Sequence, residues 1–372
     1  MLADATLDAA VRSGGRDLTI LVIRLGAMGD IVRTLPAVRL LRFGLPDARL
    51  YWIAWEPWTQ LLQGHADLDG VIAVPRSKIQ TLVRSPLGWT TAAGTTGRLL
   101  ARIRGLHAGL AVDFHGDLRA GLVGRWSGAS VRLGYEGHQQ KEGNQLFTTH
   151  RIPAGDRRTP RLERNLDLVR ALGLPVRPVP DAGLAIPSAD YRAAADIVAS
   201  LTGRRGAYAI LGPGASRRQA YKKPPPRLFA AAAAELARHD VTPIVAAGPG
   251  EDDDAARVLD ACDGNARRAP ATSLMTLAAL LRRARVFVGG DTGPLHLACG
   301  VGCPVVGLYG PTDPLVNTPW NVPFAALFPP GRTYTGIKSK DRAAGGFDGL
   351  EPDAVARATA ALVTRDRGQA AR

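Results

Sequence analysis

Short apolar runs rich in Val, Ile and Leu alternate along the chain with longer stretches in which Ala, Leu and Arg recur at helical spacing. Apolar runs without polar alternation predict strands buried on both faces, as in parallel sheets covered by helices. The pattern therefore predicts an α/β protein. The expected strands span 18–25, 49–55, 70–75, 109–114, a segment around 128–135, 207–213, 242–248, 285–290 and 304–310. The expected helices span 31–44, a stretch from 188, 227–239, 273–284 and 351–363.

A Pro-rich run at the end of 151–187 separates two series of strands and helices, and we interpret it as a linker. At roughly 150 residues per domain, a chain of 372 residues suggests two or three domains. We expect an N-terminal domain over 1–187 and a C-terminal domain over 188–348, both Rossmann-like, doubly wound and facing a cleft. The final helix, within 349–372, is expected to pack back toward the N-terminal domain.

The chain is strongly basic, with 47 Lys and Arg against 33 Asp and Glu and a net charge of +14. Such a charge attracts nucleic acid, an anionic membrane surface or phosphorylated substrates. The excess is +8 over residues 1–186 and +6 over 187–372, whereas a nucleic-acid-binding arm would concentrate it in one place. Aromatic residues are 6% of the chain and no nucleic-acid recognition motif is present, so we expect no nucleic-acid partner.

Three cysteines are too few for a disulfide framework and lack zinc-site spacing, which predicts a reducing compartment. The first 17 residues lack the apolar segment of a secretory signal. The longest uncharged stretch, 292–312, is rich in Gly and Pro and does not suit a membrane span. These features predict a cytoplasmic protein.

The first expected strand leads through Gly26-Ala-Met-Gly-Asp30 into a helix. Its glycines allow close approach of the backbone to a ligand or a neighbouring loop. Asp30 has two interpretations, a cap that accepts a backbone N–H or a general base that takes a proton from an attacking hydroxyl. The loop lacks the G-x-G-x-x-G spacing of dinucleotide-binding proteins, which disfavours a dehydrogenase.

The segment Gly289-Gly-Asp-Thr-Gly-Pro-Leu-His296 follows the expected strand 285–290 and opens a helix. Asp291 or Thr292 can cap that helix, and its unpaired N–H groups form a site for an anion such as a pyrophosphate. A lone histidine is more often a core residue, but His296 in this strand–turn–helix setting is expected to reach a ligand.

Two further strand ends carry polar residues that suit a nucleotide diphosphate. Ser216 lies in a small-residue loop that leads to Lys222 and Lys223, whose charges can neutralise phosphates or simply face solvent. Glu251 follows the strand 242–248 and can accept hydrogen bonds from ribose hydroxyls or begin an acidic helix. Several strand ends together favour a nucleotide-diphosphate site in the C-terminal half.

Together these segments resemble glycosyltransferase family 9, the ADP-heptose:lipopolysaccharide heptosyltransferases. The matching pieces, in the order of the family, are 23–42, 113–135, 212–236, 246–251 and 286–314. The resemblance implies a GT-B fold, in which two Rossmann-like domains face an interdomain cleft. It implies an inverting, metal-independent transfer of a heptose or related sugar from an ADP-sugar to a hydroxyl of a lipopolysaccharide core or related glycan.

The resemblance assigns Asp30 as the catalytic base and leaves Lys223 as a rival to Lys222 at the phosphates. The residues expected at the donor are Ser216, Lys222, Glu251, Thr272, Asp291, Thr292, Gly293 and His296. Arg119 and Arg125 are expected to meet acceptor phosphates or carboxylates, or to lie in solvent. No metal and no cofactor are implied beyond the nucleotide-sugar co-substrate, expected to be ADP-heptose.

The implied partners are the nucleotide sugar, a phosphorylated glycolipid or glycan, and the anionic inner leaflet of the cytoplasmic membrane as a peripheral surface. A family 9 enzyme with another donor or acceptor is the main alternative. A UDP-sugar 2-epimerase of the same fold is a further one, although DTGPLH departs from the D-S-G-G signature expected there. Trp52 is expected in the core, whereas Trp55 and Trp58 could stack on a sugar ring.

Overall fold

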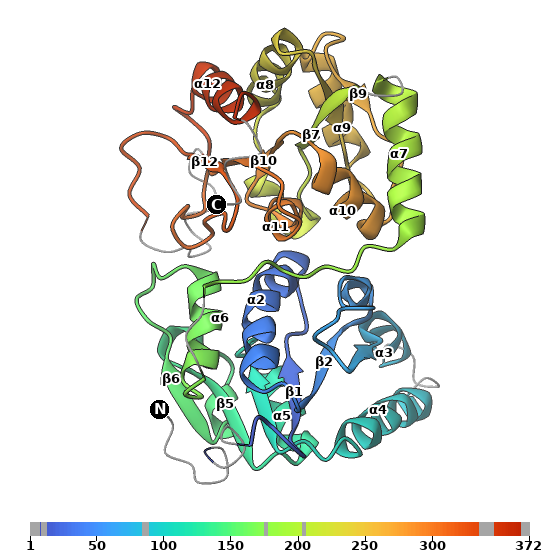
Figure 1. Ribbon diagram of the computed structural model, residues 1–372, viewed down its shortest axis with the longest axis vertical. Coiled ribbons are helices and arrows are strands. Elements are labelled where there is room, and N and C mark those ends of the chain that lie inside the picture. The colour runs from blue at the N-terminus through green and yellow to red at the C-terminus, as the bar shows by residue number, and fades with distance from the viewer. Residues whose placement is uncertain are drawn as a thin grey trace. The chain divides into compact units, whose positions relative to one another are not determined.

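The computed structural model describes residues 8, 13–83, 89–174, 178–202, 206–334 and 346–365. Most of the N-terminal stretch in which we expected no signal segment, and residues 175–177 of the expected linker, lie outside the described residues. The chain divides into two compact units, Met1–Ala185 and Ile186–Arg372 (Figure 1). The boundary expected from the sequence lies two residues later.

The N-terminal unit contains a six-stranded sheet in the order β3-β2-β1-β4-β5-β6, with all its pairings parallel. Its strands are β1 (Thr19–Ile23), β2 (Arg49–Trp55), β3 (Gly70–Val74), β4 (Leu110–Asp113), β5 (Val131–Glu136) and β6 (His150–Pro153). Its α-helices are α2 (Met28–Gly44), α3 (Arg76–Val83), α4 (Trp89–Arg104), α5 (Leu118–Ser127) and α6 (Arg161–Arg170). Its short 3-10 helices are η1 (Glu56–Leu61), η3 (Gly137–Gln139) and η4 (Asn144–Leu146).

The β1 strand is central because every residue of its TILVI sequence is buried, as the apolar run predicted. It pairs with β2 and β4, and Val22 lies in register with Trp52 and Val112. Helices α2 and α6 pack together, while α4 and α5 contribute Ile103 and Ala120 to the apolar cluster that contains Leu21 and Ile23. Trp52 is fully buried, which confirms its predicted place in the core.

The C-terminal unit contains a second parallel six-stranded sheet, in the order β12-β11-β10-β7-β8-β9. Its strands are β7 (Ala207–Gly212), β8 (Val241–Val245), β9 (Arg267–Arg268), β10 (Phe287–Gly290), β11 (Val305–Leu308) and β12 (Phe324–Leu327). Its helices are α7 (Ser188–Thr202), η5 (Arg217–Lys222), α8 (Pro226–Arg238), α9 (Asp252–Ala261), α10 (Leu274–Arg283), α11 (Gly293–Gly300) and α12 (Pro352–Val363).

The last helix, α12, differs from our expectation that it packs back toward the N-terminal domain. It packs on α8, β11 and β12 of the C-terminal unit. The physical reason is its apolar face, because Val355 and Leu362 are buried in the same core cluster as Leu228 and Phe229 of α8.

Each sheet reverses its strand order at its centre, between β1 and β4 in the N-terminal unit and between β7 and β10 in the C-terminal unit. Ligands of open parallel sheets bind at the carboxyl ends of the strands at such a reversal. The loop that carries Asp30 follows β1, and the loop that carries Asp291 follows β10. The topology therefore places the two strongest sequence motifs at the expected binding positions of their own units.

Candidate active site

Asp30 lies in the first turn of α2, directly after the loop that leaves β1. The N-cap position of α2 is occupied by Ala27, with no side-chain cap hydrogen bond. The Asp30 carboxylate does not act as the cap that was one of its two interpretations. A fifth of its side-chain surface is exposed, so it remains accessible.

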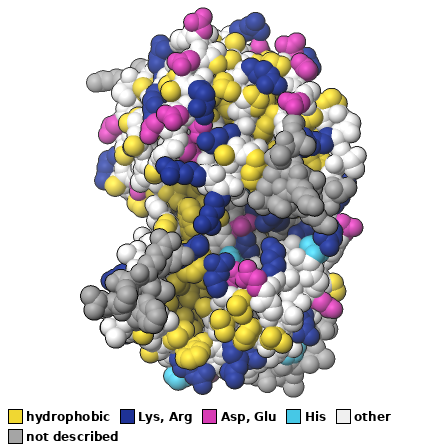
Figure 2. Space-filling model, turned by 180° about the vertical axis from the view of Figure 1, so that it is seen from behind, with side chains coloured by type: hydrophobic (Ala, Val, Ile, Leu, Met, Phe, Trp, Pro, Cys, Tyr) yellow, Lys and Arg dark blue, Asp and Glu magenta, His cyan; other side chains and the backbone are white. Residues whose placement is uncertain are grey.

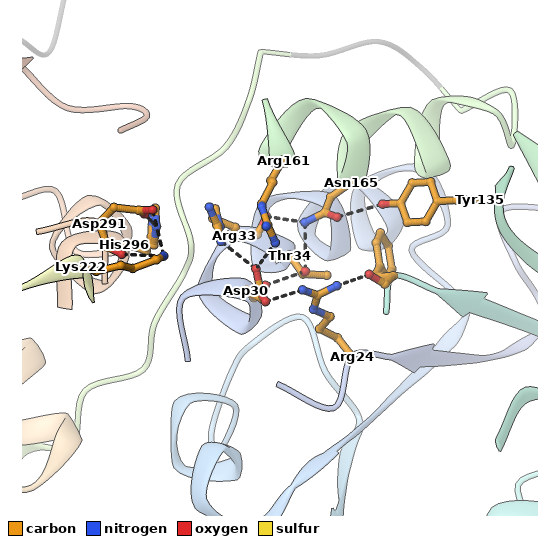
Figure 3. A network of polar contacts seen from close by, with 11 residues as sticks. Arg24, Asp30, Arg33, Thr34, Tyr135, Arg161, Asn165, Lys222, Asp291 and His296 are labelled. Atoms are coloured by element: carbon orange, nitrogen blue, oxygen red, sulfur yellow. Dashed lines mark hydrogen bonds and ion pairs between the residues drawn. The ribbon is translucent and has the colours of Figure 1, made fainter. Parts of the chain in front are cut away.

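Three guanidinium groups surround this carboxylate (Figure 3). Arg24 lies 2.6 Å from Oδ2, whereas Arg33 and Arg161 lie 2.7 Å and 3.5 Å from Oδ1. Burial raises the pKa of Asp30, but the three positive charges outweigh it, so that this pKa lies well below its usual range. Asp30 is therefore ionised at neutral pH, in surroundings with an excess of positive charge.

The first turn of α2 is held by a second set of hydrogen bonds that crosses to α6 and β5. The Asn165 amide donates to the Thr34 hydroxyl over 3.0 Å and to the Arg33 carbonyl over 3.1 Å, and Tyr135 donates to the Asn165 amide oxygen. Thr34 in turn donates to the backbone carbonyl of Asp30. These contacts, drawn in Figure 3, fix the position of the carboxylate relative to the sheet.

Sequence reasoning missed all three arginines and Asn165. Arg33 could have been found, since a basic residue three positions after Asp30 lies on the same helix face. Arg161 and Asn165 come from α6, more than 130 residues away along the chain, and no local signal in the sequence points to them.

The loop after β4 also holds Arg24 in place, because the Arg24 guanidinium donates a hydrogen bond to the backbone carbonyl of Phe114. The loop itself is shaped by Asp113, which accepts from the backbone N–H groups of His115 and Gly116 and from the Asn144 amide, at 2.8–2.9 Å. Burial raises the pKa of Asp113. This carboxylate has a structural role in the loop beside the site.

Trp55, the last residue of β2, and Trp58 of η1 lie beside the loop that contains Gly26. A Cβ atom at Gly26 would lie 2.8 Å from the Trp58 ring nitrogen, and Gly26 has a φ of +155°, so this position requires glycine. The Trp55 ring is covered by the guanidinium groups of Arg76 and Arg119, at 5.2 and 5.8 Å from its centroid. Stacking of Trp55 or Trp58 on a sugar remains a prediction.

The two arginines expected at the acceptor lie at different ends of α5. Arg119 is in the first turn, where its Nε donates to Asp117 over 2.9 Å. Arg125 is exposed in the last turn, and α5 runs back from the carboxyl edge of the sheet, so its position lies toward the opposite edge from Asp30. The structure thus places Arg119, but not Arg125, near the edge that carries the carboxylate.

In the C-terminal unit, the turn after β10 leads directly into α11. Thr292 is the N-cap of α11 and makes no side-chain cap hydrogen bond, and Gly293 is the first helical residue. A helix start without a side-chain cap can offer its first backbone N–H groups to an anion. Thr292 thus occupies the predicted N-cap position without a side-chain cap hydrogen bond of its own, and the pyrophosphate interpretation of the turn stays a prediction.

Asp291 joins Lys222 and His296 in one cluster, in which Asp291 and His296 are buried and Lys222 is partly buried (Figure 3). The Lys222 ammonium lies 3.0 Å from Asp291 Oδ2, and the His296 ring nitrogen Nε2 lies 3.2 Å from Oδ1. Lys223 pairs instead with Asp254 of α9, where its ammonium lies 2.5 Å from the carboxylate oxygen Oδ2. Of the two lysines, the structure brings Lys222 to the D-T-G turn.

Glu251 links the loops after β7 and β8. Its carboxylate accepts from the Gly248 N–H over 2.8 Å and lies so close to Gly214 that a Cβ atom there would be 1.8 Å from Oε2. Ser216 is exposed at the start of η5, and Thr272 is half-buried ahead of α10. The predicted donor residues thus follow four adjacent strands, β10, β7, β8 and β9.

The described residues meet the requirements of neither a metal site nor a membrane-spanning helix. Among them, no group of three or more His, Cys, Asp or Glu side chains is placed to hold a metal ion. No helix in the described part of the chain is both long and apolar enough to cross a membrane.

Comparison with known structures identifies the fold. A family 9 glycosyltransferase from Veillonella parvula superposes with a TM-score of 0.76 at 18% identity, over 94% of this chain and 97% of that one. Escherichia coli heptosyltransferase WaaC with ADP gives 0.71 at 21% identity, over 91% and 98%. The two parallel sheets with flanking helices therefore form a GT-B fold, as expected from the sequence.

Sequence comparisons identify the family. The model of glycosyltransferase family 9 (heptosyltransferase) matches residues 96–328. Lipopolysaccharide heptosyltransferase 3 of Escherichia coli is 23% identical over 79% of this chain and 84% of its own length. Lipopolysaccharide core heptosyltransferase OpsX of Haemophilus influenzae is 24% identical over 82% of each chain. The protein is a glycosyltransferase, and it belongs to glycosyltransferase family 9.

Proposed function

We propose that this enzyme transfers a heptose or related sugar from an ADP-sugar, ADP-heptose in the first instance, to a hydroxyl of a lipopolysaccharide core or related glycan. The transfer is inverting and independent of a metal ion. Asp30 is the general base. The observation that carries the proposal is the Asp30 carboxylate, which stands at the carboxyl end of β1, stays partly exposed and is held ionised by three arginines.

In the proposed step, Asp30 takes the proton of the acceptor hydroxyl while the acceptor oxygen forms a bond to the anomeric carbon. The bond between that carbon and the ADP oxygen breaks, and ADP leaves with the electron pair. Because attack and departure occur on opposite faces of the sugar, the anomeric configuration inverts.

A carboxylate with a strongly lowered pKa is a weak base, so its surroundings must change when the acceptor binds. An acceptor that carries phosphate or carboxylate groups would pair with Arg24, Arg33 and Arg161 and reduce their hold on Asp30. The basicity of Asp30 would then rise in the complex. This argument favours an anionic acceptor, such as a phosphorylated glycan, over a neutral one.

The donor half of the proposal uses the C-terminal unit. The uncapped start of α11, at Thr292 and Gly293, suits the diphosphate, and Lys222 supplies a positive charge beside the same turn. These groups would stabilise the departing ADP, the electrostatic role that a metal ion has in other transferases. Glu251 would accept hydrogen bonds from the ribose hydroxyls.

Family relatives named as lipopolysaccharide heptosyltransferases also support a lipid-linked acceptor. We therefore propose a cytoplasmic enzyme that associates peripherally with the anionic inner face of the cytoplasmic membrane, where a lipid-linked acceptor would be anchored.

The decisive experiment incubates the purified enzyme with ADP-heptose and a heptose-deficient lipopolysaccharide core, with EDTA present, and measures ADP release and mass gain of the acceptor. We expect transfer in EDTA and none from UDP- or GDP-sugars. Transfer from another nucleotide sugar alone would replace the donor in this proposal, and a strict requirement for added magnesium would contradict the mechanism.

A further inference from the structure

The outer face of α5 carries large apolar side chains that do not pack into the core. Leu118, Leu122 and Trp126 are 38%, 46% and 52% exposed. They recur every fourth residue, so they form one continuous stripe along the helix. Leu146 of η4, which packs beside α5, is 79% exposed.

The fold does not need this stripe. The helix is attached to the unit through its small residues on the opposite side, and Ala120, Gly121 and Gly124 are buried. Gly121 lies against Phe147 and Asn144 so closely that a Cβ atom would be about 3 Å from either side chain. Contiguous apolar surface of this kind marks an interaction site more often than isolated exposed residues do.

The charge around the stripe is positive. From the start of α4 to the end of α5, residues 89–127 contain five arginines, all of them exposed, and two aspartates, Asp113 and Asp117, both of which are buried. The arginines are Arg98, Arg102, Arg104, Arg119 and Arg125.

The arrangement of these arginines follows the two helices. On α5, Arg119 and Arg125 flank the apolar stripe on either side, as the helical angle of 100° per residue requires. The Arg104 guanidinium of α4 lies against Gly128, the C-cap of α5. In Figure 2, hydrophobic side chains lie among Lys and Arg side chains at the lower end of the molecule, with few Asp or Glu side chains beside them.

We propose that the α5 stripe, formed by Leu118, Leu122, Trp126 and Leu146, docks the enzyme on an anionic lipid bilayer. Apolar side chains would enter the interface between headgroups and acyl chains, where tryptophan is favoured, and the surrounding arginines would meet lipid phosphates. A protein partner without a strong negative charge would not complement the arginines around the stripe. Arg125, expected from the sequence to bind the acceptor, has a place in this surface.

The inference adds a docking surface to the proposed function and relies on it only for the lipid anchor of the acceptor. The test uses the full chain and flotation with two kinds of vesicle, one of phosphatidylglycerol with phosphatidylethanolamine and one of phosphatidylcholine alone. We expect binding to the first, little binding to the second, and weaker binding as salt is added.

The key variant is the double substitution Leu122→Ser with Trp126→Ser, which should weaken vesicle binding at least about tenfold. The matched control is Phe43→Ser on α2, where an apolar side chain 44% exposed lies outside the stripe, and its vesicle binding should be unchanged. Arg125→Glu, which places an acidic side chain beside the stripe on α5, should weaken binding roughly fivefold or more. Transfer to a water-soluble acceptor without a lipid tail should be equal in wild type and the double variant.

The inference is overturned if the wild type does not bind anionic vesicles, or if the double variant binds them as well as the wild type. It is also overturned if the double variant only dissociates an oligomer in sedimentation velocity, since the occupant would then be a second copy. Loss of vesicle binding in the double variant, with no sugar transfer to any acceptor by the wild type, would keep the docking surface and reject the proposed function instead.

Discussion

The Arg24 guanidinium lies 2.6 Å from Asp30 Oδ2 and donates at the same time to the backbone carbonyl of Phe114. One half-buried side chain thus joins the helix after β1 to the loop after β4, the two strands between which the sheet reverses its order. Arg24 therefore contributes to both the position and the charge state of the carboxylate.

Asp30→Asn should abolish transfer while ADP binding persists. The substitution keeps the shape of the side chain but removes the proton acceptor, and loss of a general base typically costs about 10²–10⁴-fold in rate. ADP release by the variant and its affinity for ADP by calorimetry provide the measurement, with thermal melting as the check on folding. Near-normal turnover would reject Asp30 as the base.

The pH dependence should change when Arg24 is replaced by Met. In the free wild type, Asp30 stays ionised as the pH falls from 8 to 5, because its pKa lies well below its usual range. Removal of one lowering charge raises this pKa, so the acid limb of kcat/KM should move to higher pH in Arg24→Met. The measurement is kcat/KM between pH 4.5 and 8, and superimposable acid limbs would contradict the assignment.

The same lowered pKa predicts a stability signature. Ionised Asp30 stabilises the folded state at pH values above its unfolded pKa of about 3.9, and this contribution is lost only as the pH falls through the lower folded pKa. Urea unfolding of wild type and Asp30→Asn should therefore differ by a constant free energy between pH 5 and 7. The difference should shrink below about pH 4, and a difference that shrinks near neutral pH would be inconsistent with the arginine cluster.

The two adjacent lysines should respond differently to replacement. Lys222→Ala should weaken ADP binding and slow transfer roughly tenfold or more, since it removes the ammonium beside the α11 turn. Lys223→Ala is the matched control, because Lys223 pairs with Asp254 on α9 and should leave ADP binding unchanged. Calorimetric titration with ADP compares the two variants. An equal loss of ADP affinity in both would show that the phosphates do not bind Lys222 in preference to Lys223.

The central strands could be predicted from the sequence because they are the most apolar runs in the chain. For example, TILVI and FVGG are buried throughout and became β1 and β10. The edge strands β6, β9 and β12 were missed, since exposed or half-buried residues such as those of HRIP carry little apolar signal. Their places are set by pairing with a neighbouring strand rather than by their own composition.

The candidate site was predictable where its residues sit in one turn and unpredictable where it is assembled from distant elements. Asp30 and Asp291 follow apolar strands directly, so each motif is visible locally. The pairing of Asp30 with Arg161, and of Asp291 with Lys222, depends on how α6 and η5 pack, which residue spacing does not encode. The place of Arg125 was unpredictable for a related reason, because the direction of α5 puts this residue in the last turn of the helix, away from the carboxyl edge of the sheet.

Gly214→Ala should impair recognition of the ribose without touching the phosphates. A Cβ atom there would lie 1.8 Å from Glu251 Oε2, so the carboxylate must move out of the loop junction. If Glu251 binds the ribose, the wild type prefers ADP to 2′,3′-dideoxy-ADP, and the variant should lose most of that preference, roughly tenfold or more for a hydrogen-bonded carboxylate. Gly97→Ala in α4 is the control, because its Cβ meets nothing within 4 Å and should leave both affinities unchanged. Calorimetry with both nucleotides decides, and a preference retained in Gly214→Ala would remove Glu251 from the ribose site.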